Sequence, residues 1–241
     1  GLFCMLLTGT YFLSLNTYRS VTLSRARVTR SARVSMSKNP RPKVAPRKTA
    51  DRTEPPRAAD RIRASARELF YREGIRAVGV DEIVNRAGVT KPSLYRTFPS
   101  KDDLAAAYLR DYERDCWESF ERPGGKTYRD PREHVLAYIR DLSSRAVRKG
   151  YRGCGLSNVT VEYPSSDHPA RQVAEIHKKA LRTRLRELAA AMGAQRPAVL
   201  GDALLLLIEG IYVTGQQFHD GPAQSALAAA KMLIDASMKP V

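Results

Sequence analysis

Residues 78–104 read VGVDEIVNRAGVTKPSLYRTFPSKDDL and contain two short helical patterns on either side of a glycine turn. The first pattern, 81–87, opens with two acids, which are favourable at the positive N-terminal end of a helix. Gly88 suits the tight turn, and Thr90 is a good N-cap for a second helix whose first turn contains Pro92. A short helix, a glycine-containing turn and a further helix are typical of a helix-turn-helix.

Further helical patterns flank this motif on both sides. The preceding helix, 58–72, ends before Gly74, and the following one, 101–120, begins after Pro99 with Ser100 as its N-cap. The apolar stripe of the preceding helix consists of Ile62, Ala66, Leu69 and Phe70. These segments predict an all-α chain with an N-terminal three-helix head and a larger helical body.

The charge of the chain favours a polyanionic partner. The sequence has 41 Lys and Arg against 25 Asp and Glu, a formal net charge of +16. Such an excess points to nucleic acid or to an anionic membrane surface. A helix-turn-helix would lay its last helix in a DNA major groove. The pattern alone leaves an alternative open, a small helical bundle whose basic face is simply solvated.

Three groups of residues resemble the N-terminal signature of the TetR family of bacterial transcriptional regulators. The family usually shows a Gly-Val-Ser/Thr turn, then Leu-Tyr-x-His-Phe, then a Lys at the start of a helix. The matching residues here are Gly88-Val89-Thr90, then Leu94-Tyr95-Arg96-Thr97-Phe98, then Lys101. The resemblance spans roughly residues 58–108, and it implies a DNA-binding head, a helical body that binds a ligand, and a homodimer.

The resemblance also implies a role for each residue that matches the motif. Leu94 and Phe98 belong to the core, whereas Tyr95 and Lys101 meet backbone phosphates. One departure is Thr97, which replaces the common His and offers a shorter, uncharged contact. The side chains expected to face bases or the groove wall are Lys91, Pro92, Ser93 and Arg96. The complete set of expected DNA-binding residues is Arg57, Thr90, Lys91, Pro92, Ser93, Tyr95, Arg96, Thr97 and Lys101.

The body is expected to contain further helices and one loop. The expected helices are 131–149, 156–163, 168–192, 197–218 and 223–238, with a loop at 150–155. The inward stripe of the long helix at 168–192 is read as Val173, Ile176, Ala180, Leu185 and Leu188. In the family the last two helices pair with those of a second subunit. The dimer contacts expected on that basis are Leu204, Leu207, Ile208, Ile211 and Gly215; burial within one subunit is the alternative.

A ligand pocket is expected among the body helices, because aromatic side chains with a few polar groups form orienting cavities. The expected lining residues are Tyr112, Cys116, Trp117, Tyr138, Leu142, Cys154, Asn158 and His177. Ordinary core packing is the alternative for each of them. Cys154 lies between two glycines, and part of the family resembles it with a Gly-Cys there. That resemblance implies a place in the pocket wall or redox sensing, against the simpler interpretation of a small buried residue.

The sequence carries no recognisable signature of catalysis. It contains no P-loop, GxSxG, HExxH or complete dinucleotide fingerprint, and its four His are scattered. Three Cys without a CxxC pair indicate neither a disulfide framework nor a zinc site, which suits a reducing cytoplasm. We therefore predict no enzyme, no metal and no cofactor.

The N-terminal quarter differs in composition from the rest. Residues 1–60 contain 12 Lys and Arg but only three Asp and Glu. The apolar start of 1–35 is interpreted as coming from an upstream start or an expression vector, with a working protein beginning near Met36; a genuine export signal is the alternative. Five prolines and alternating basic charges predict a disordered basic arm over 36–57. The expected domains are thus 1–57, a head at 58–104 and a body at 105–241.

These features together predict a ligand-responsive DNA-binding regulator of the cytoplasm. We expect a homodimer that acts as a repressor and that an unknown small molecule releases from double-stranded operator DNA, with no membrane partner. Two alternatives remain, a helical enzyme that keeps the head as a relic and a non-specific nucleoid-type DNA binder driven by the basic arm.

Overall fold

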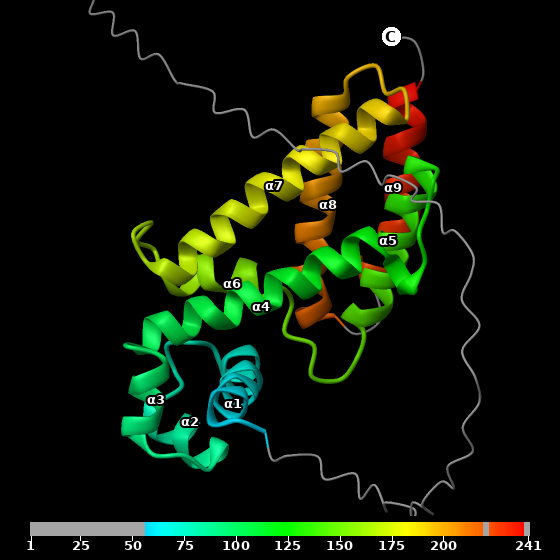
Figure 1. Ribbon diagram of the computed structural model, residues 1–241. Helices are drawn as coiled ribbons and strands as arrows, with labels where there is room; N and C mark the ends of the chain where they lie inside the picture. The colour runs from blue at the N-terminus through cyan, green and yellow to red at the C-terminus, as the bar shows by residue number, and fades with distance from the viewer. Residues whose placement is uncertain (1–55, 219–221, 239–241) are drawn as a thin grey trace, which may run out of the picture. The chain divides into compact units, whose positions relative to one another are not determined.

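The computed structural model describes residues 56–218 and 222–238, and every regular element in these ranges is helical (Figure 1). The all-α prediction is therefore confirmed for the described chain. Contacts divide the chain between Arg52 and Thr53, and the second unit contains all the described residues. The expectations for 1–55 lie outside the described part. The helices are α1 (Ala58–Glu73), α2 (Val80–Ala87), α3 (Lys91–Thr97), α4 (Lys101–Glu121), α5 (Pro131–Ala146), α6 (Gly155–Glu162), α7 (Pro169–Ala191), α8 (Pro197–Gln217) and α9 (Pro222–Met238), with a short 3-10 helix, η1 (Pro123–Gly125).

The head forms as the sequence predicts. Gly88 ends α2 in the left-handed conformation, with φ of +60°, where a glycine is favoured. The Thr90 side chain accepts a hydrogen bond from the Ser93 backbone N–H, and Ser100 accepts one from Asp103, so both predicted N-caps are confirmed. The buried stripe of α1 includes the predicted Ile62, Ala66, Leu69 and Phe70.

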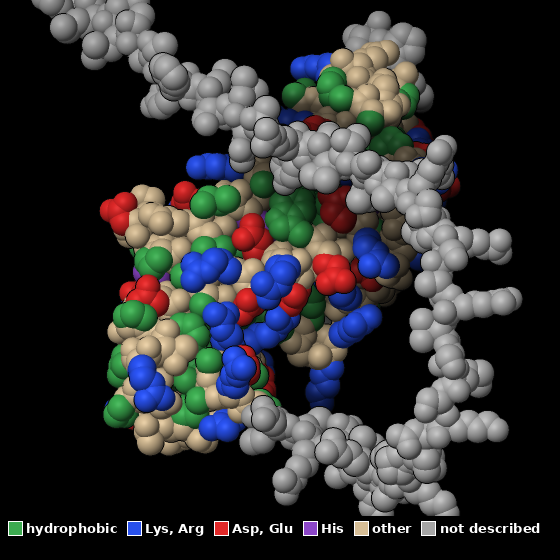
Figure 2. Space-filling view, in the orientation of Figure 1, with side chains coloured by type: hydrophobic (Ala, Val, Ile, Leu, Met, Phe, Trp, Pro, Cys, Tyr) green, Lys and Arg blue, Asp and Glu red, His purple; other side chains and the backbone are tan. Residues whose placement is uncertain are grey.

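Helix α4 connects the head to the body. Its first half is buried from Leu104 to Leu109, where it passes α1 and enters the body. Two ion pairs join α1 to α4, Arg63 to Asp111 at 2.7 Å and Arg67 to Asp115 at 2.6 Å. Such partly exposed pairs contribute little energy, so the apolar contact is the main attachment. Basic and acidic side chains accordingly alternate across the middle of the face shown in Figure 2.

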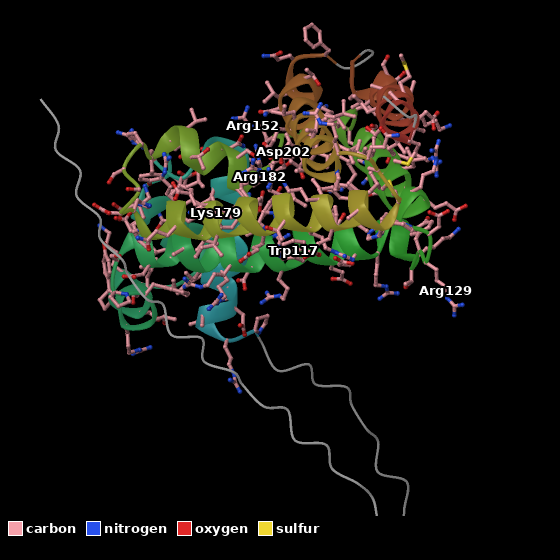
Figure 3. All side chains as sticks on the ribbon, turned by 90° about the horizontal axis from the view of Figure 1, so that it is seen from above. Trp117, Arg129, Arg152, Lys179, Arg182 and Asp202 are labelled. Carbon is pink, nitrogen blue, oxygen red and sulfur yellow. The ribbon has the colours of Figure 1, made fainter. Side chains whose placement is uncertain are left out.

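In the body, α7 packs between α4 and α8. Trp117 of α4 lies near the contact between α4 and α7, and Arg182 of α7 lies beside Asp202 of α8 (Figure 3). The predicted stripe of α7 is wrong at Ile176 and Ala180, which are exposed. The small side chains on the adjacent face allow the neighbouring helices to approach more closely than Ile176 would. The residues that α7 buries are Ala170, Ala174, His177, Leu181, Leu185, Leu188 and Ala189.

Helix α8 packs against α5, α7 and α9. A Cβ on Gly201 would lie 2.8 Å from the Arg186 backbone, which shows how closely α8 approaches α7. Arg182 and Arg186 both hydrogen-bond Asp202 with two nitrogens, and these bonds lower the pKa of the Asp202 carboxyl. Among the described helices, α8 is the one long and apolar enough to cross a membrane, a property that core helices of soluble proteins share.

Candidate functional site

Helix α3 presents almost its whole surface to solvent. Within the helix only Leu94 is buried, and Phe98, which follows it, is buried as well, as predicted. The Tyr95 side chain is 46% exposed although it is aromatic. The exposed residues of α3 are Lys91, Pro92, Tyr95, Arg96 and Thr97, with Ser93 half-buried. The structure thus brings most of the expected DNA-binding residues together on one helix. A DNA major groove is wide enough to admit an α-helix.

Lys91 has a partner that the sequence did not reveal. Its Nζ lies 2.8 Å from Oδ1 of Asp81, in the first turn of α2. The hydrogen bond from Lys91 to Asp81 raises the pKa of the ammonium, so Lys91 is fully charged. A base contact by Lys91 therefore requires it to leave Asp81, which holds it at the N-terminus of α3 until then.

The basic residues around α3 have different roles. Arg57 is exposed at the start of α1. Arg61 instead donates from Nε to the Ala87 carbonyl at 3.0 Å and so satisfies the end of α2. Lys101 donates to the Arg76 carbonyl at 3.3 Å, and partial burial lowers its pKa. Lys101 is thus hydrogen-bonded to the loop between α1 and α2.

A cavity of about 250 Å³ lies where α1, α4, α5, α8 and the 150–154 loop meet. Five tyrosines line it: Tyr71, Tyr112, Tyr138, Tyr151 and Tyr212. The other lining residues are Cys116, Ser119, Arg145, Arg148, Lys149, Gly150 and Gly153. An aromatic wall with a few convergent polar groups has the composition of a site for a small organic molecule.

The structure brings only some of the expected pocket residues to this cavity. Tyr112, Cys116 and Tyr138 line it, and Cys154 is buried directly after the lining Gly153. The other four do not line it. Leu142 is fully buried in the core, and Trp117 packs edge-on against His177. Asn158 donates its side-chain amide to the Arg152 carbonyl.

The sequence reasoning missed nine of the twelve lining residues. Among them are Tyr71, Arg145, Tyr151 and Tyr212, which come from three helices and a loop. Tyr71 follows the buried Leu69-Phe70 pair of α1, and nothing in its own segment points to the body. Tyr151 lies in the loop that contains Cys154. The only feature of the sequence that could have indicated it is an aromatic residue two positions before Gly153.

The lining of the cavity combines neutral tyrosines with three cationic side chains. Burial raises the pKa of Tyr138 and Tyr212, whose hydroxyls hydrogen-bond each other at 2.9 Å. The Arg145 guanidinium donates to Ser119 Oγ at 3.0 Å and pairs with Asp141. Arg148 and Lys149 lie beside it in the lining. Asp141 neutralises only one of these three cations, so the lining has a net positive charge.

The cavity wall is physically continuous with the head. Tyr71 of α1 donates to the Gly153 carbonyl at 3.3 Å and accepts from the Arg152 backbone N–H at 3.1 Å. At the far end of α6, Glu162 accepts from the Arg76 backbone N–H at 3.0 Å, and Arg76 donates back to the Glu162 carbonyl. The loop thus contacts the last turn of α1, and α6 contacts the α1–α2 connection.

Four of the five expected dimer residues on α8 are buried within the subunit, which is the alternative that the sequence left open. Leu204, Ile208 and Ile211 are almost completely buried within the subunit. Gly215 is buried where α8 meets α5, since a Cβ there would lie 2.7 Å from that of Ala146. Of the five expected residues only Leu207 is partly exposed. The apolar residues that α8 exposes are Val199, Leu206 and Val213, each seven residues after the last.

His177 gives a pH-dependent stability that can be tested. Burial and the nearby Lys178 charge lower its pKa from 6.5 to about 4, and Glu113 Oε1, at 3.6 Å, is too far to hydrogen-bond. Between these pH values the unfolded chain binds the proton and the folded protein does not. We therefore expect His177 to lower the free energy of unfolding by about 3 kcal/mol as pH falls from 6.5 to 4.

The measurement is urea unfolding at several pH values for the wild type and for His177→Phe, which keeps the aromatic contact with Trp117. We expect the variant to lose less stability than the wild type over this pH range. Equal slopes in the two proteins would show that His177 does not carry the effect.

Comparison with known proteins agrees with this architecture. The sequence model of the family described as "Bacterial regulatory proteins, tetR family" matches residues 62–108. The HTH-type transcriptional repressor BdcR of Escherichia coli is 27% identical over 175 residues, which cover 71% of this chain and 86% of that protein. The HTH-type transcriptional activator FasR of Mycolicibacterium smegmatis is 40% identical over 75 residues, which cover 31% and 34% of the two chains.

Solved structures extend the likeness to about three quarters of the chain. The TetR-family regulator SCO4454 of Streptomyces coelicolor has a TM-score of 0.71 and 29% identity, over 76% of this chain and 96% of its own. A putative regulator of the same family from Streptomyces avermitilis has a TM-score of 0.68 and 30% identity, over 76% and 98%. The exposed helix α3 and these matches show that the chain belongs to the TetR family of DNA-binding transcriptional regulators.

Proposed function

We propose that this regulator is a dimeric repressor that a small organic anion releases from its operator in the cytoplasm. The observation that carries the proposal is the position of Tyr71, which belongs to helix α1 of the head and lines the cavity of the body. A molecule in that cavity touches the head directly. The relative BdcR is named a repressor and FasR an activator, so the sign of regulation rests on this mechanism.

Release would follow from competition for Tyr71. The Tyr71 hydroxyl donates to the Gly153 carbonyl and accepts from the Arg152 backbone N–H of the loop. A ligand that hydrogen-bonds Tyr71 or displaces the loop favours another angle of α1 to the body. Only a ligand that binds better to the released state can shift the population, so the cavity must fit better after the loop has moved.

The lining of the cavity favours a small aromatic acid. Tyrosine rings offer stacking and edge contacts to a planar molecule, and a carboxylate or phenolate would pair with the lining Arg145. A volume of about 250 Å³ limits the ligand to roughly one or two rings. We expect such a compound to lower the fraction of DNA retarded by the protein.

A second subunit would cover the exposed side of α8 and α9. Val199, Leu206 and Val213 follow a seven-residue repeat along α8. Gly210 lies between the last two, and a Cβ on it would meet no atom within 4 Å. On α9, Met232 is 72% exposed. A seven-residue apolar repeat is the spacing of packed helix pairs, so two copies of α8 and α9 would form a four-helix bundle.

Substitution of two lysines with different surroundings tests how the head recognises DNA. We expect Lys91→Ala to relax preference at one operator position by about 1–3 kcal/mol, because its ammonium can reach guanine O6 and N7 from the start of α3. We expect Lys101→Ala to weaken all sites alike and to flatten the slope of log affinity against log salt by about one unit. The measurement is affinity for genomic fragments selected by the protein, and for their single-base variants, across a salt series.

Asp81→Asn is the matched control, because it frees Lys91 and removes a negative charge beside the DNA. We expect it to raise affinity without changing base preference. Uniform weakening by Lys91→Ala would move Lys91 to the phosphate contacts and base reading to Ser93 and Arg96. Equal affinity for all sequences at physiological salt would favour a non-specific nucleoid-type binder, and no retardation at all would favour an enzyme with a relic head.

A further inference from the structure

A second hollow, of about 500 Å³, lies along helix α1 of the head. Five of its lining residues belong to α1 and one to α4: Ala64, Arg67, Glu68, Tyr71, Arg72 and Tyr112. Tyr71 and Tyr112 also line the cavity, so these two side chains form a wall that both spaces share. The second hollow is thus larger than the cavity, and the DNA-binding head provides most of its surface.

The shared wall offers different atoms to the two spaces. The rings of Tyr71 and Tyr112 are stacked, with their centres 6.1 Å apart and their planes 26° apart. Both hydroxyls donate to the carbonyl of Gly153, which lines the cavity, at 3.3 Å from Tyr71 and 3.5 Å from Tyr112. The hydroxyls are therefore engaged on the cavity side. A molecule in the second hollow can contact the rings without competing for these hydrogen bonds.

The charged side chains of the second hollow already have partners. Arg67 pairs with Asp115 at 2.6 Å, and Arg72 pairs with Glu68 at 3.5 Å. Glu68 also pairs at 2.6 Å with Arg86, which does not belong to the lining. The cavity differs, because its lining has a net positive charge. An ionised ligand finds no free counter-ion in the second hollow, so its charge would lose hydration without gaining a partner.

The rest of this lining suits a flat apolar molecule. Tyrosine rings stack on other aromatic rings, and planar guanidinium groups stack on aromatic faces as well. The stems of Arg67 and Arg72 add apolar surface beside the Ala64 methyl group. The lining therefore offers stacking surface and no free charge, which is the composition that a neutral planar aromatic molecule requires.

We propose that the second hollow binds a neutral planar aromatic molecule and that this molecule strengthens DNA binding, in contrast to the anion in the cavity. A ligand stabilises the state that it binds. The hollow exists here together with the hydrogen bond from Tyr71 to Gly153, which the proposed function assigns to the operator-bound state. The effect on DNA thus rests on the proposed function, whereas binding in the hollow does not.

The test compares two fluorescent probes that differ by one charged group. N-phenyl-1-naphthylamine is neutral, and 8-anilino-1-naphthalenesulfonate has the same rings with an added sulfonate. Both emit more strongly in apolar surroundings, so each is titrated into the full chain by fluorescence. We expect the neutral probe to bind with a Kd of about 1–10 µM. At this site we expect the anionic probe to bind at least about tenfold more weakly.

Ala64→Gln locates the binding site. Ala64 is exposed and lines the second hollow but not the cavity, so the substitution fills the hollow with a polar, uncharged group and leaves the core intact. We expect it to weaken the neutral probe at least about tenfold. Ala180→Gln is the matched control, the same substitution at an exposed position of α7, and is expected to change nothing. Tyr71→Phe keeps the ring and removes the hydroxyl, so it should bind the neutral probe as the wild type does.

The effect on DNA is measured with a genomic fragment that the protein selects. We expect the neutral probe to raise affinity for this fragment by about fivefold or more in the wild type and not in Ala64→Gln. The proposal is overturned if the neutral probe does not bind, if Ala64→Gln leaves its binding unchanged, if Ala64→Gln weakens the two probes equally, or if the bound probe does not raise DNA affinity. If the protein binds no DNA even without probe, the proposed function fails, and the titrations still decide whether the hollow is a site.

Discussion

Leu206→Glu is expected to convert the dimer into folded monomers whose operator affinity is at least about 100-fold lower. The Leu206 side chain is 72% exposed on a single subunit, so a carboxylate there costs the subunit little. In a dimer the same side chain would lie at the centre of the seven-residue repeat on α8, where a desolvated charge is unfavourable. A monomer has one DNA-binding head, so it lacks the additional affinity that comes from binding two half-sites at once.

The measurement is sedimentation at micromolar concentration together with thermal unfolding. Ile176→Glu is the matched control, because Ile176 is similarly exposed but lies on α7, away from the proposed interface. Ile211→Glu is the opposite control and is expected to unfold the subunit, since Ile211 is 2% exposed. A dimeric Leu206→Glu protein would place the interface elsewhere, and a monomeric wild type would contradict operator recognition by two heads.

Gly153→Ala is expected to lower the free energy of unfolding by about 2–4 kcal/mol. The residue has φ of +70°, which costs a side chain about 1–2 kcal/mol. A Cβ would also lie 2.7 Å from the Tyr212 carbonyl, within the backbone of α8. Relief of that contact requires the loop to move, and the loop carries the acceptor for Tyr71. We therefore expect weaker DNA binding along with the lost stability.

Gly150→Ala separates the two causes. Gly150 lies in the same loop with φ of +80°, but a Cβ there meets no atom within 4 Å. We expect Gly150→Ala to lower the free energy of unfolding by only about 1–2 kcal/mol, the cost of the left-handed backbone conformation, and to leave DNA affinity unchanged. Urea unfolding and DNA retardation of both variants provide the comparison. If Gly150→Ala matched Gly153→Ala in both measurements, close packing against α8 would not matter.

The head could be predicted from the sequence because its signals are local. Thr90 and Ser100 bind backbone groups three residues away, and Gly88 supplies a conformation that its own turn requires. Each of these effects acts within one turn of helix. The one feature of α3 that the sequence hid is the contact of Lys91 with Asp81, which depends on how α2 and α3 are placed.

The cavity could be predicted only in part, since its walls come from segments far apart in the chain. Tyr112, Cys116 and Tyr138 were expected because they lie on helices of the body. Tyr71 was not, because its role depends on where α1 meets the 150–154 loop.

The sequence by itself determined where the helices lie and what ends them, because caps, glycine turns and helical periodicity act over a few residues. Only the tertiary structure decided which side of α7 and α8 faces the core. Helix α8 is apolar almost all round from Leu204 to Ile208, so its periodicity does not select a face. The close approach of α5, α7 and α9 selects it. Packing thereby buries Leu204, Ile208 and Ile211 and leaves Leu206 exposed.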